Sequence, residues 1–64
     1  MTIRQLCEVG GAQRGYALES LRPSHLPGAW TAVYRGANNQ LTCLEVDSIW
    51  LGRGPTAMAM TLFT

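Results

Sequence analysis

Two acidic residues in the second half of the chain, Glu45 and Asp47, are the first candidates for chemistry. They stand two positions apart among β-forming residues, and alternate residues of a strand point to the same side. Paired carboxylates can exchange protons or bind a metal ion, although they more often mark the solvated end of a strand. The functional alternative is an acidic patch that meets arginine side chains of a protein partner.

The other residues with reactive side chains are one histidine, His25, and two cysteines, Cys7 and Cys43. A catalytic pair would need a nucleophile and an orienting carboxylate nearby. Ser24 adjoins His25, but neighbours in a chain rarely face each other usefully, so we expect an exposed loop histidine. The Cys and His spacing matches no zinc pattern, and neither cysteine has a local basic activator. We therefore predict no metal, no cofactor and no enzymatic activity. Both cysteines are expected to be free thiols, with a single disulfide as the alternative.

Two glycine-rich stretches, residues 10–15 and 52–54, each contain an arginine. Such loops can bind phosphate groups through their backbone amides. Neither stretch matches the P-loop or the dinucleotide-binding fingerprint, both of which need further residues and a following helix. We interpret both stretches as turns.

Large aromatic side chains are the strongest candidates for recognition, because Trp and Tyr dominate the energetics of protein interfaces. Trp50 is expected to complete the core, whereas Trp30 and Tyr34 belong to a stretch that also carries charges. The predicted partner-binding residues are Trp30, Tyr34, Arg35, Glu45 and Asp47.

A β-hairpin over residues 30–47 is the element that must position these side chains. Gly36, Asn38 and Asn39 can enter the left-handed conformations of a tight turn, and β-forming residues flank them on both sides. The number of loop residues decides which side chains share a face, and an odd number would mix the two sets.

An even loop would produce a mixed face and a cleaner apolar face. The mixed face would contain Trp30, Ala32, Tyr34, Leu41, Cys43, Glu45 and Asp47. The opposite face, with Val33, Leu44 and Val46, would then contact the core.

Turn and capping signals divide the rest of the chain into short elements. Thr2 and Gln5 have the spacing of a capping box, which predicts a helix over residues 3–9 that ends at Gly10-Gly11. Residues 12–22 are ambiguous: Leu18 and Leu21 three apart favour a helix by a small margin, whereas alternation also permits a strand. Two prolines and a glycine predict a loop over residues 23–28.

The C-terminal third is expected to extend the sheet. Residues 48–51 continue the second strand of the hairpin or form a third strand, and residues 52–55 form a turn. Residues 56–63 alternate in a way that suits a last strand, with a helix as the alternative because Ala and Met favour helices.

These elements predict a single α+β domain spanning residues 1–64. One or two short N-terminal helices would pack on a three- or four-stranded antiparallel sheet built around the hairpin, because an isolated hairpin is marginal in water. A small all-β barrel is the alternative. A domain of this length buries only about 60% of the surface of its unfolded chain, so its stability is limited.

Composition narrows the functional classes. Charged residues make up 14% of the chain, below the roughly 25% of ordinary domains, which favours association with a partner. The net charge is +1 and the five arginines are dispersed, whereas a nucleic-acid-binding stripe should be denser. The chain shows neither a secretory signal nor an apolar run long enough for a membrane span, so we expect a cytoplasmic protein.

The sequence therefore favours a non-enzymatic protein-binding module. Domains of this size without a catalytic motif are often encoded by phages and mobile elements, where they block a host enzyme or defence complex. An anti-CRISPR-type inhibitor is one concrete version. The alternative is a small nucleic-acid-binding module that contacts phosphates through Arg4, Arg14, Arg35 and Arg53.

Overall fold

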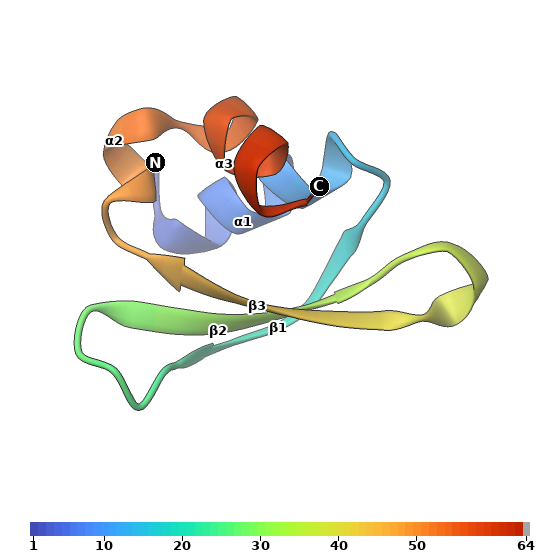
Figure 1. Cartoon of the computed structure of the whole chain (residues 1–64), viewed down its shortest axis with the longest axis horizontal. Helices are drawn as coiled ribbons and strands as arrows, with labels where there is room; N and C mark the ends of the chain where they lie inside the picture. The colour runs from blue at the N-terminus through green and yellow to red at the C-terminus, as the bar shows by residue number, and fades with distance from the viewer. Residues whose placement is uncertain (64) are drawn as a thin grey trace.

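A computed structural model describes residues 1–63, in which three helices lie on one face of a three-stranded antiparallel sheet (Figure 1). The strand order is β1-β2-β3. The elements in chain order are α1 (Ile3–Ala12), β1 (Ala17–Pro23), β2 (Ala29–Arg35), the 3₁₀ turn η1 (Ala37–Asn39), β3 (Leu41–Asp47), α2 (Trp50–Arg53) and α3 (Pro55–Leu62). The α+β prediction is confirmed.

The N-terminal helix α1 begins where the sequence predicts. The Gln5 amide donates to Thr2 Oγ1 at 3.1 Å, and the Thr2 amide donates to Gln5 Oε1 at 2.9 Å, which completes the capping box. The predicted end of the helix is wrong, because α1 continues through Gly10 and Gly11 to Ala12. Both glycines are buried, and a β-carbon on Gly11 would overlap the Tyr34 ring. These glycines therefore allow close packing of the helix and do not end it.

Strand β1 replaces the helix favoured for residues 12–22. Leu18 lies opposite Tyr34, and Ser20 lies opposite Val33. Glu19, between them, is therefore an extra residue that forms a β-bulge. Residues three apart in a regular strand point to opposite faces, but the extra residue places Leu18 and Leu21 on the same face, where both pack against the core. Two leucines three apart therefore share a face in this strand as they would in a helix, and this explains the incorrect prediction.

The predicted hairpin is confirmed as β2 and β3, joined by the five residues 36–40. Asn38 and Asn39 both adopt φ near 59°, a left-handed conformation that asparagine tolerates better than most residues. The loop is odd in length, so Tyr34 lies opposite Thr42 and Trp30 lies opposite Val46. The predicted mixed face, which assumed an even loop, is wrong.

The C-terminal third is helical, which corrects the strands expected over residues 48–51 and 56–63. Ser48 and Ile49 turn the chain into α2, and Gly54 (φ 95°) separates α2 from α3. Pro55 then occupies the first turn of α3, where its missing N–H is tolerated and its fixed φ suits a helix. The Ala and Met residues, which favour helices, decided the outcome over alternation.

The core lies between the helices and the sheet face formed by Ala32, Tyr34 and Val46. Its other fully or nearly buried members are Leu6 and Cys7 from α1, and Met58, Ala59 and Phe63 from the C-terminal segment. Tyr34 meets the Phe63 ring edge-on at a centroid distance of 4.8 Å, and Tyr16 lies 4.9 Å from the same ring. The helix layer thus packs on the face with Leu44 and Val46, as expected, but Val33 faces away from it.

Candidate functional site

One face of the sheet is left uncovered by the helices (Figure 1). Because Ala32, Tyr34 and Val46 point into the core, the residues that alternate with them point to the opposite side. We call this side the open face. Its paired members are Ala17, Ser20 and Arg22 of β1, Ala29, Thr31, Val33 and Arg35 of β2, and Leu41, Cys43, Glu45 and Asp47 of β3.

Three of the five predicted partner-binding residues, Arg35, Glu45 and Asp47, lie on the open face. Tyr34 does not, because its side chain is completely buried among the helices. Trp30 is half-buried and lies on the helix side of the sheet, opposite Val46. The prediction that these aromatic and acidic side chains share one surface is therefore wrong, and the odd loop length is the reason.

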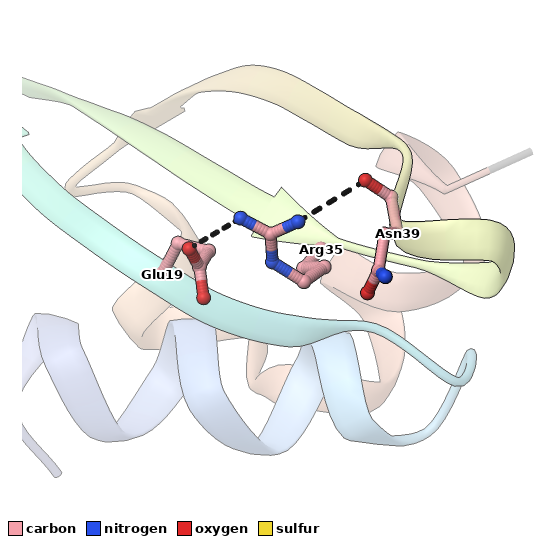
Figure 2. Close-up of polar contacts among 3 residues, drawn as sticks. All are labelled: Glu19, Arg35 and Asn39. Carbon is pink, nitrogen blue, oxygen red and sulfur yellow. Dashed lines mark hydrogen bonds and ion pairs between the residues drawn. The ribbon is translucent and has the colours of Figure 1, made fainter.

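Arg35 is held by two contacts at one end of the open face. Its Nη2 donates to Glu19 Oε1 at 2.9 Å, and its Nη1 donates to the Asn39 carbonyl at 3.2 Å (Figure 2). The hydrogen bond and charge of Arg35 lower the pKa of Glu19, and Glu19 in turn raises the pKa of Arg35. About 38% of the Arg35 side chain remains exposed, so the guanidinium is oriented but still accessible.

Glu19 can reach Arg35 because of the bulge in β1. The bulge gives β1 one residue more than the facing segment of β2, and that residue carries the carboxylate. Sequence reasoning missed Glu19. The available signal was the pair of leucines on either side of it, which a bulge as well as a helix can bring to one face.

Glu45 is the best-supported acidic group of the open face. Its two carboxylate oxygens accept hydrogen bonds of 2.7 Å each, one from Thr31 Oγ1 and one from Ser24 Oγ. These hydrogen bonds, that from Thr31 first, lower the pKa of Glu45. Glu45 is therefore an ionised and positioned carboxylate, although it is exposed to solvent. Sequence reasoning did not find Thr31 and Ser24, since their contact with Glu45 depends on the strand register.

Asp47 has a local structural task at the end of β3. Its Oδ1 accepts a hydrogen bond from the Ile49 amide at 3.0 Å and therefore stabilises the turn into α2. The side chain stays exposed next to the position of Glu45 on the open face. The two acids and Arg22, which lies opposite Thr31, thus stand toward one end of this face, and the Arg35–Glu19 pair lies toward the other end.

The other reactive side chains do not converge. Cys7 is buried in α1, where desolvation raises the pKa of its thiol, whereas Cys43 is exposed on the open face. Both are free, as predicted, and they lie on opposite sides of the sheet. Within residues 1–63 no three His, Cys, Asp or Glu side chains are grouped as metal ligands, and no pocket is present. His25 is an exposed loop residue, as predicted.

Three of the four arginines considered for phosphate binding make internal contacts. Arg14 donates to the Phe63 carbonyl from Nε (3.3 Å) and Nη2 (3.1 Å), and the Arg53 guanidinium lies 5.4 Å from the centre of the Trp50 ring. Arg35 is paired with Glu19, and Arg4 is exposed on α1. These four residues come from different elements and do not form a continuous basic stripe.

Comparison of the chain with protein-family models, with curated proteins and with solved structures found no match. In the described part of the chain, no helix has both the length and the apolar character needed to cross a lipid bilayer.

Proposed function

We propose that this protein is a non-enzymatic protein-binding module that uses the open face of its sheet. The observation that carries the proposal is the division of the sheet into one face covered by helices and one face that no element of residues 1–63 covers (Figure 1). The middle of the open face contains the half-buried Val33 between Ser20 and the exposed Cys43, with charged groups toward both ends. A mixture of apolar centre and charged rim is typical of protein interfaces.

The partner should present basic side chains to Glu45 and Asp47. Glu45 is ionised and fixed by Thr31 and Ser24, so little side-chain entropy remains to be lost when an arginine of the partner binds it. The Arg35–Glu19 pair at the other end would favour a partner surface that carries both charges. Blocking a host enzyme or defence complex, as an anti-CRISPR-type inhibitor does, is one concrete form of this activity. A cytoplasmic location accords with the two free thiols.

The decisive experiment compares charge reversals on the two sides of the molecule. Immobilised wild-type protein is used to recover binding proteins from a host lysate, with and without nuclease, and the recovered proteins are identified by mass spectrometry. Glu45→Lys combined with Asp47→Lys should abolish recovery of the specific partner. Glu8→Lys, an exposed acid of α1, should leave recovery unchanged.

Other outcomes would redirect the assignment. Loss of binding in Trp30→Ala, with binding retained in the Glu45/Asp47 variant, would move the site to the helix side of the sheet. Recovery that disappears with nuclease would instead support nucleic-acid binding through the arginines. Circular dichroism of each variant verifies that the fold is retained.

A further inference from the structure

The two edges of the sheet differ in their protection. Strand β1 is interrupted by the bulge at Glu19 and ends at Pro23, two features that discourage further strand pairing. Strand β3 has seven regularly paired residues, without proline or bulge, and within residues 1–63 its outer edge has no strand beside it. The edge of β3 is therefore the one open to a further strand.

The backbone groups at this edge follow from two hydrogen bonds that bracket the β2–β3 ladder. The Gly36 amide donates to the Gln40 carbonyl at 2.8 Å, and the Ser48 amide donates to the Gly28 carbonyl at 3.2 Å. In an antiparallel ladder the hydrogen-bonded pairs alternate, so every second residue of β3 between these points faces β2. The residues whose N–H and C=O groups face the free edge are consequently Leu41, Cys43, Glu45 and Asp47.

The acidic side chains of β3 do not guard this edge. The Glu45 carboxylate is drawn across β2 by Thr31 and Ser24, away from the free edge. Asp47 is engaged with the Ile49 amide of its own chain. Charged side chains on an edge strand normally hinder pairing with another chain. Here the hydrogen bonds of Glu45 and Asp47 keep their carboxylates away from the free edge.

We propose that β3 pairs antiparallel with β3 of a second copy of this chain, forming a continuous six-stranded sheet. With a two-fold axis at Leu44, all seven residues of each β3 strand pair, and all four outward-facing residues of each strand form hydrogen bonds. Leu44 then lies opposite Leu44 of the second copy, and Cys43 lies opposite Glu45, so no two acids are directly opposed. The protected β1 edges become the ends of the new sheet, which limits assembly to two copies.

This pairing is independent of the proposed binding function, but it would join two open faces into one surface. Leu44 supports the choice of a second copy as the occupant. Its side chain packs at the margin of the core on the helix side, and the pairing would cover it with its own counterpart. A small domain with limited buried area also gains stability when it associates.

A matched pair of variants at one position tests the hydrogen bonds. Cys43→Pro removes an outward N–H that the monomer does not use, and Cys43→Ala retains it. Analytical ultracentrifugation should give a dimer for wild type and Cys43→Ala. Cys43→Pro should raise the dimer dissociation constant by about 30-fold or more, since the two-fold axis removes two hydrogen bonds. Equal dissociation constants for Cys43→Pro and Cys43→Ala, or a wild-type protein that stays monomeric at millimolar concentration, would overturn the proposal.

Two further measurements test the register and the location. Cys43→Glu faces Glu45 of the second copy and should weaken the dimer, whereas Cys43→Lys should retain or strengthen it. In hydrogen exchange, the amides of Cys43 and Glu45 should become protected only as the concentration rises. A dimer that protects other amides and leaves these two unprotected would contradict pairing through β3. These readouts need no host partner, so failure of the dimer and failure of the proposed binding activity are distinguishable.

Discussion

The Tyr34 hydroxyl donates a hydrogen bond of 2.8 Å to the carbonyl of Cys7, so the central strand is tied directly to α1. Tyr34 is completely buried, and its ring also contacts Phe63. One side chain therefore joins the sheet, the N-terminal helix and the C-terminal segment. It anchors the fold, whereas the sequence suggested a recognition role for it.

Tyr34 should make the stability of the protein sensitive to alkaline pH. Burial raises the pKa of Tyr34 above its usual value, whereas in the unfolded chain the phenol ionises near pH 10. The unfolded state then binds fewer protons above about pH 10, so the free energy of unfolding should fall as the pH rises beyond that value. Urea unfolding of wild type at a series of pH values measures the slope.

Tyr34→Phe is the matched variant for this prediction. Loss of the hydrogen bond to Cys7 should lower its free energy of unfolding by about 1 kcal/mol at neutral pH. The part of the decrease in the free energy of unfolding that arises above about pH 10 should also disappear, because the phenol is absent. The raised pKa of Cys7 gives a separate decline that begins lower, near the ordinary thiol pKa of about 8.5, and this decline should persist in the variant. An unchanged slope above pH 10 in Tyr34→Phe would contradict the assignment to Tyr34.

Gly11 should be among the least replaceable residues of α1. A β-carbon at this position would overlap the Tyr34 ring, so Gly11→Ala should destabilise the protein by about 1–3 kcal/mol although alanine favours helices. Gly52→Ala in α2 is the control, because a β-carbon there meets no atom within 4 Å. The control should be neutral or more stable by up to about 1 kcal/mol. Thermal unfolding of the two variants measures the contrast, and equal effects would argue against close packing of α1 on Tyr34.

The ionisation of Glu45 should depend on Thr31. Thr31→Val keeps the shape of the side chain and removes the hydroxyl that donates to Glu45, so the pKa of Glu45 should rise toward its ordinary value. Because the pKa of Glu45 is lower in the folded state, Glu45 contributes stability at pH values above its unfolded pKa of about 4.3. This stability is lost as the pH falls through the pKa of Glu45 in the folded state. NMR titration of the Glu45 carboxyl carbon measures the shift. Ser24→Ala should produce a smaller rise, and no rise in either variant would contradict the hydrogen-bonded position.

The sequence identified the elements whose signals are local. Thr2 and Gln5 fixed the start of α1 through a capping box, and the residues around Asn38 and Asn39 fixed the hairpin. The pair of acids at one end of a strand, Glu45 and Asp47, was accessible in the same way. These features need contacts only between residues close in the chain.

Tertiary structure decided which side chains share a surface. The loop of five residues placed Tyr34 on the same face as Leu44 and Val46, and packing of the helices on that face buried it. The extra residue Glu19 kept Leu18 and Leu21 on one face of a strand. Each outcome depends on whether the turn or the bulge contains one residue more or fewer, because a shift of one residue moves every following side chain of the strand to the other face. The Ala- and Met-rich tail forms a helix, and it buries Met58 against α1 and Phe63 against Tyr34 of the sheet. The sequence by itself therefore determined the elements with local caps and turns, and long-range packing determined the register and the exposed surface.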